Sequence, residues 1–118
     1  MPIGAGSDAP AAPYIVPGPA LHQELEALVR AGLTPGQALQ SATDVAAGIL
    51  GQPDLGRLDA GTRADVVVVD GDPLADIRAT RNVVAVWKDG AAVDLAAAWP
   101  ALESALDAAR AEAEAAGV

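Results

Sequence analysis

Few side chains in this sequence belong to the types that perform chemistry. The 118 residues include no cysteine and a single histidine, with sixteen carboxylates against seven basic side chains. The missing cysteines exclude a disulfide scaffold, a thiolate metal site and a cysteine nucleophile. A carboxylate can still act as a hard ligand for a divalent metal ion and as a proton acceptor. Any metal or acid–base chemistry therefore depends on the setting of individual carboxylates.

Three isolated side chains have both a structural and a chemical interpretation. Asp8, taken alone, is typical of a turn or capping carboxylate. His22 lies beside the apolar stripe of a predicted helix, where a lone imidazole is more typical of a packing or surface residue than of a substrate contact. Lys88 lies at a tight turn, the position at which carrier domains attach a lipoyl or biotinyl group, but those domains are nearly all β. We interpret Lys88 as a solvated turn residue.

One strand is unmistakable, in the stretch of residues 61–73 that reads GTRADVVVVDGDP. Consecutive β-branched residues favour a strand, and the lack of polar alternation predicts that both of its faces are covered. The Gly-Asp-Pro sequence ends it sharply. Asp65, Asp70 and Asp72 flank this strand, and their wide spacing is typical of turn caps rather than of metal ligands.

Three short helices are predicted upstream of this strand. The first begins at Leu21 and stops at Gly32, and one apolar face is formed by Leu21, Leu25, Leu28 and Val29. The second begins at Pro35, because Thr34 and Gln37 have the spacing of a capping box. The third covers residues 45–50, capped by Thr43 or Asp44.

Downstream, two strands over residues 83–87 and 91–95 are separated by an Asp-Gly turn and predict a hairpin. A helix over residues 99–116 is predicted to begin with Pro100 near its first turn and to dock through Trp99, Leu102 and Leu106. The fold class is therefore α+β. With no phenylalanine and 3% aromatic residues, the core is expected to be thin.

The net charge of the chain limits the classes of partner that it can bind. A net charge of -9 argues against binding to nucleic acid and to anionic membrane surfaces. The sequence has no long apolar run and no charged-then-apolar leader, so we expect a cytoplasmic protein.

The order of these motifs resembles a known family. Residues 32–73 are similar to the C-terminal part of metal-dependent hydrolases of the amidohydrolase superfamily, in the branch of imidazolonepropionases and prolidase-like enzymes. The matching pieces are a Gly-Leu-Thr-Pro helix start, an Ala-Thr helix end, a Gly-x-Leu-x-x-Gly turn, an Ala-Asp before the aliphatic strand, and a closing Asp-Pro. Residues 3–9 resemble the end of the eighth barrel strand and residues 21–25 the helix after it, so the resemblance covers about residues 3–95.

The resemblance implies a particular architecture. Complete members have a (β/α)₈ barrel that holds one or two divalent metals, with zinc expected, and a β-sandwich built from both chain termini. Residues 1–52 would be the end of the barrel, residues 53–98 the C-terminal sandwich strands, and residues 99–118 a C-terminal helix. Surfaces that would pack on the rest of the barrel, notably the stripe of Leu21, Leu25 and Leu28, should be exposed or buried by self-association.

The resemblance also assigns a role to Asp8. It matches the family aspartate that binds the catalytic metal and takes a proton from the metal-activated water, although Ser7 stands where the family usually has threonine. The other family ligands, a His-x-His pair, a bridging Glu or carboxylated Lys and two further histidines, have no counterpart in this sequence.

Two functions follow from these observations. In the first, the chain is part of an amidohydrolase that cleaves C–N bonds of a cyclic amide or dipeptide-like substrate, and the histidines are supplied by a complementing polypeptide or lost by truncation. In the second, the chain is a catalytically silent module for binding or for homo-oligomer formation. In both cases we expect the isolated chain neither to hold a metal tightly nor to hydrolyse amides.

Overall fold

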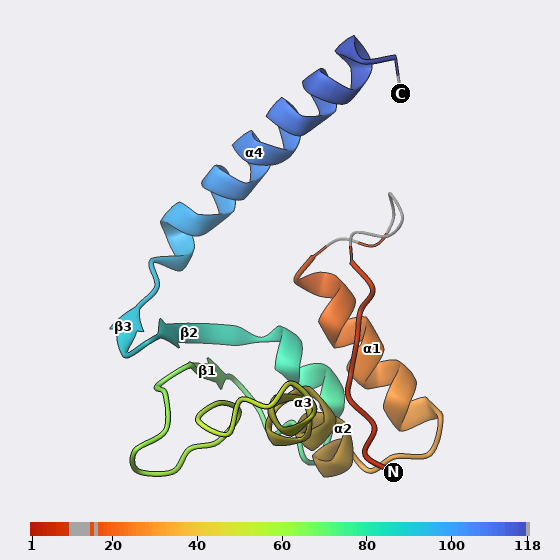
Figure 1. The fold of residues 1–118 in the computed structure, drawn as a ribbon, viewed down its shortest axis with the longest axis vertical. Coiled ribbons are helices and arrows are strands. Elements are labelled where there is room, and N and C mark those ends of the chain that lie inside the picture. Colours follow the sequence, from red (N-terminus) through yellow and green to blue (C-terminus); the bar gives the residue numbers. More distant parts are fainter. Residues whose placement is uncertain (10–14, 16, 118) are drawn as a thin grey trace.

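The computed structural model describes residues 1–9, 15 and 17–117 and has the mixed helix and strand composition that the sequence predicts (Figure 1). A helical layer comes first, a small sheet follows, and a long helix ends the chain. The elements in chain order are α1 (Pro19–Arg30), α2 (Pro35–Ala42), α3 (Asp44–Ile49), β1 (Val66–Val69), the 3₁₀ helix η1 (Ile77–Arg81), β2 (Val83–Lys88), β3 (Ala91–Ala92) and α4 (Leu95–Ala115).

The core lies where α1 packs against α2 and η1. Leu25, Ala38 and Ile77 are buried at its centre, and the partly buried residues packed around them are Leu28, Val29, Leu39 and Ala42. The expectation that the leucine stripe of α1 is exposed or needs self-association is therefore wrong for most of its length. Leu25 is 4% exposed and Leu28 packs on the core, while Leu21 remains exposed. The sequence did not predict η1, whose Ile77 covers the stripe.

The start of α2 confirms the predicted capping box. Thr34 Oγ1 accepts a hydrogen bond from the Gln37 backbone N–H at 3.2 Å, and Gln37 Oε1 accepts one from the Thr34 N–H at 2.9 Å. The start of α3 differs from prediction, because Thr43 holds the cap position without a side-chain cap hydrogen bond and Asp44 is already the first residue of the helix. The Thr43 hydroxyl donates to the Leu39 carbonyl at 2.8 Å, so it is bonded back into α2.

The predicted hairpin is confirmed within a three-stranded antiparallel sheet of order β1-β2-β3. The prediction that both faces of the valine strand are covered is wrong in this chain. Val67 is 58% and Val68 41% exposed, and these neighbours point to opposite faces. Among the described residues no second layer packs over the sheet. The run of valines is suited to a strand buried on both faces, and the described residues do not provide the layer that would bury it.

The terminal helix also departs from prediction. It begins at Leu95 rather than at residue 99, because Asp94 caps it by accepting from the N–H groups of Ala96 and Ala97 at 3.0 and 3.1 Å. This cap shortens β3 to two residues and leaves Pro100 inside the helix.

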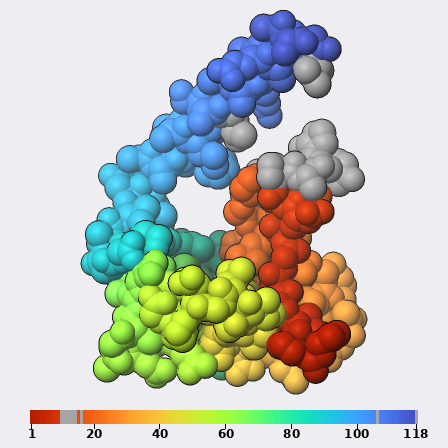
Figure 2. Space-filling model, viewed as in Figure 1, coloured from red at the N-terminus to blue at the C-terminus, as the bar shows by residue number. Residues whose placement is uncertain are grey.

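Among the described residues, the predicted docking of α4 on the body is not observed. Trp99 is 57% and Leu102 37% exposed, and the side chain of Leu106 lies outside the described part. The helix projects from the rest of the molecule (Figures 1 and 2). No helix among the described residues is both long and apolar enough to cross a membrane.

Candidate functional site

The candidate residue Asp8 is the last residue of the segment 1–8, and Figure 1 shows this N-terminal segment running beside the helical layer. The Ala5 N–H donates to the carbonyl of Ser41 on α2 at 2.8 Å. Gly4 lies against Ile49, and a Cβ on it would meet Ile49 Cδ1 at 3.0 Å. Residues 1–8 form no strand, because this segment bonds to a helix and finds no neighbouring strand among the described residues.

Asp8 itself occupies a tight turn. Its φ of 54° is in the left-handed region, which aspartate tolerates better than most non-glycine residues. The N–H of Ala9 donates to Ser7 Oγ at 3.4 Å, and the Gly6 N–H lies 3.5 Å from Glu24 Oε1 on α1. Asp8 is exposed, so its carboxylate is accessible to a ligand.

A complete metal centre is not formed by the described residues. Among them, no group of three or more His, Cys, Asp or Glu side chains is placed to hold a metal ion. A catalytic zinc site takes three protein ligands besides its water, so a single carboxylate does not fit a bound metal without further donors. Asp8 can contribute one anionic oxygen donor and can accept a proton.

His22 has a structural position between α1 and η1. Its Nδ1 lies 3.0 Å from Thr80 Oγ1, and the Thr80 hydroxyl donates to the Ile77 carbonyl at 2.8 Å. Because the one hydroxyl proton is used there, His22 Nδ1 is the donor in its bond to Thr80. Burial lowers the pKa of His22 below its usual value, the cation of Arg81 lowers it further, and Glu26 opposes both. These contacts favour the packing interpretation.

Of the three carboxylates predicted to cap turns around the valine strand, Asp65 and Asp72 do so. Asp65 Oδ1 accepts from the backbone N–H of Asp89 at 2.8 Å, and Lys88 Nζ donates to both Asp65 oxygens at 3.0 and 2.9 Å. The hydrogen bond from the Asp89 N–H lowers the pKa of Asp65 below its usual value, and the hydrogen bond from Lys88 lowers it further. Asp72 Oδ1 accepts from the Leu74 N–H at 2.9 Å. Lys88 is thus held in an ion pair at the hairpin tip.

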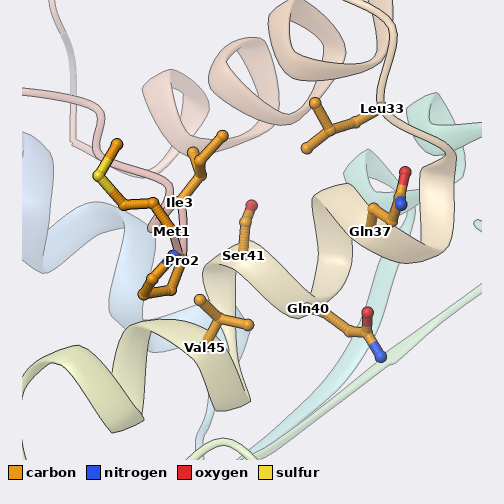
Figure 3. Close-up of a pocket in the computed structure, with 8 residues that line it drawn as sticks. All are labelled: Met1, Pro2, Ile3, Leu33, Gln37, Gln40, Ser41 and Val45. Carbon is orange, nitrogen blue, oxygen red and sulfur yellow. The ribbon is translucent and has the colours of Figure 1, made fainter.

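Two open hollows lie elsewhere on the helical layer. One, of about 330 Å³, lies between the N-terminal segment and α2 and is mainly apolar (Figure 3). Its lining consists of Met1, Pro2, Ile3, Leu33, Gln37, Gln40, Ser41 and Val45. The second, of about 440 Å³, lies between the start of α3 and the loop of residues 56–59. Asp8 lines neither hollow, so the candidate carboxylate and the described cavities do not form one site.

Comparison with known proteins establishes the class. The model of the amidohydrolase family matches residues 3–93, and the chain belongs to this family. The extent agrees closely with the resemblance over residues 3–95 inferred from the motifs. The family assignment made from the sequence is therefore confirmed.

Particular members show how much of a relative the chain represents. A putative prolidase from Bifidobacterium longum has a TM-score of 0.73 and 40% identity over 80% of this chain and 23% of its own. Molinate hydrolase has a TM-score of 0.64 and 37% identity over 65% of this chain and 17% of its own. Adenine deaminase 2 of Agrobacterium fabrum is 46% identical over 56 residues, which are 48% of this chain and 9% of that protein. The chain thus spans less than a quarter of each of these relatives.

Proposed function

We propose that this chain is part of a metal-dependent hydrolase of C–N bonds, to which it contributes the carboxylate of Asp8. The observation that supports this most directly is the family match, which begins at residue 3 and includes Asp8 with its turn. The substrate class we propose is an amide or a dipeptide, because the similar structures include a putative prolidase and a Xaa-Pro dipeptidase.

The proposal requires donors beyond the described residues. Asp8 would supply an anionic oxygen and a proton acceptor, while the remaining donors would come from further sequence of a longer protein or from a complementing polypeptide. A divalent metal, zinc in our proposal, would supply the Lewis acidity. The helical layer behind the segment would fix the position of Asp8 through the bond from Ala5 to Ser41. A cytoplasmic location is retained as part of this proposal.

A chimera tests the proposal. Residues 3–93 would replace the matching segment of the putative prolidase from Bifidobacterium longum, and hydrolysis of Xaa-Pro dipeptides would be measured. We expect a chimera that is active and that loses activity by about 10²-fold or more with Asp8→Asn, since proton transfer by a positioned group contributes that much. Asp70→Asn, which removes an equal charge at the end of β1, should leave activity near that of the parent chimera.

Two results would count against the assignment of Asp8. An Asp8→Asn chimera as active as its parent would remove the residue from the site. Equal losses in the Asp8→Asn and Asp70→Asn chimeras would show a general effect of charge instead.

The second candidate is a catalytically silent binding or oligomerisation module. It is favoured by one observation, that no three-donor group occurs among the described residues. The two candidates differ in the role of Asp8, which matters in the first and not in the second.

A further inference from the structure

One face of α4 carries large apolar side chains that no other part of the described chain covers. Leu95, Trp99 and Leu102 are exposed, as is every α4 residue whose side chain the structure describes. In the sequence their alternating spacing of four and three continues through Leu106, Ala109, Ala113 and Ala116. This is the spacing of a coiled-coil seam, with large residues in its first half and alanines in its second.

We propose that this face of α4 binds the same face of a second copy of the chain, with the two helices antiparallel. In one register the large residues within the overlap meet small ones, because Trp99 lies opposite Ala116 of the partner subunit and Leu102 opposite Ala113 of the partner subunit. The two-fold axis repeats these layers in the other direction. Residues 99–116 overlap in this register, a length of about 27 Å.

The charges on α4 select the same register. Beside the seam, Glu103 would lie opposite Arg110 of the partner subunit, and the two-fold axis creates a second such pair. Arg110 is available for this role, since its side chain is 77% exposed and its ion pair with Asp107 is long, at 3.6 Å. Glu103 Oε1 accepts from the Trp99 indole N–H at 2.9 Å, which places this carboxylate next to the seam.

Other arrangements of the two helices lose these matches. A shift of the antiparallel register by seven residues places Glu103 opposite Glu103 of the partner subunit. A parallel pair places tryptophan against tryptophan and alanine against alanine, and it sets both Glu103 and Arg110 beside alanines. Only the proposed register satisfies size and charge together, which is how coiled coils specify orientation.

The test is the concentration-dependent mass of the full chain, measured by sedimentation equilibrium. We expect a monomer–dimer equilibrium in which Glu103→Arg raises the dissociation constant about tenfold or more, because two attractive pairs become two repulsive ones. Glu114→Arg is the matched control, with the same change of charge on the outer side of α4, and it should not weaken the dimer. The double variant Glu103→Arg with Arg110→Glu should restore wild-type affinity.

Each alternative result has a definite meaning. A chain that stays monomeric up to about millimolar concentration would overturn the proposal, as would equal weakening by Glu103→Arg and Glu114→Arg. Failure of the double variant to recover affinity would exclude the antiparallel register. Far-UV circular dichroism on each variant confirms that α4 is still helical.

Discussion

Gly56 shows at the scale of a single residue why the Gly-x-Leu-x-x-Gly motif needs its first glycine. Its φ is 74°, and a Cβ on it would lie 2.5 Å from the carbonyl carbon and oxygen of Thr43. The loop after α3 therefore passes directly over the peptide at which α3 begins. Only glycine combines this conformation with so close an approach.

Replacing Gly56 by alanine should destabilise the chain. We expect Gly56→Ala to lower the free energy of unfolding by about 2–4 kcal/mol, from the left-handed backbone together with the clash. Gly61→Ala is the control, since Gly61 has a φ of 90° and open space where its Cβ would be. It should cost about 1–2 kcal/mol, the backbone part alone. Urea unfolding measures both, and equal losses would show that the close approach is not needed.

His22 predicts a pH dependence of stability. Its folded pKa lies below the unfolded value of about 6.5, so the unfolded chain binds the proton more readily. The stability that the neutral imidazole contributes is therefore present above about pH 6.5 and is lost as pH falls through the folded pKa. Urea unfolding at pH 7.5 and 5.5 should show a lower free energy of unfolding for wild type at the lower pH. His22→Asn, which keeps an N–H donor, should flatten this difference, and an undiminished difference would exclude His22 as its source.

For helices and strands, the sequence predicts the features that depend on a few neighbouring residues and misses those that depend on tertiary packing. The capping box of Thr34 and Gln37 and the Asp-Gly hairpin turn are complete within a few residues, so the sequence reveals them. Asp94 and Pro100 are alternative signals for the start of α4, and the sequence pattern does not show which of the two sets it. The exposure of β1 and the packing of η1 depend on what else is present in space, and periodicity alone carries no such information.

The hairpin tip offers a test at this scale. Asp65, just before β1, accepts from the Asp89 N–H and holds Lys88 across the sheet. Asp65→Ala should therefore speed amide hydrogen exchange at Asp89 relative to wild type. Asp70→Ala, which removes a carboxylate from the other end of β1, should leave exchange at Asp89 unchanged. Similar exchange rates in wild type and Asp65→Ala would mean that the turn is stable without the contacts of Asp65.

At the scale of the whole molecule, the motifs identified the family and its extent, but the site could be predicted only as a single residue. Asp8 stands out through its sequence neighbours, not through its own chemistry, and it belongs to no group of three or more potential metal donors among the described residues. The same incompleteness explains the exposed valines of β1. The site lacks further metal donors and the sheet lacks a layer packed over it, and the described residues provide neither.

Calorimetric titration with zinc tests the central claim most directly. The 118-residue chain alone should show no micromolar zinc binding. The chimera with the putative prolidase should bind zinc tightly, and Asp8→Asn should weaken that binding at least about tenfold. Micromolar binding by the isolated chain that Asp8→Asn abolishes, or a chimera whose zinc affinity ignores Asp8→Asn, would contradict the claim that Asp8 completes a metal centre whose other donors lie elsewhere.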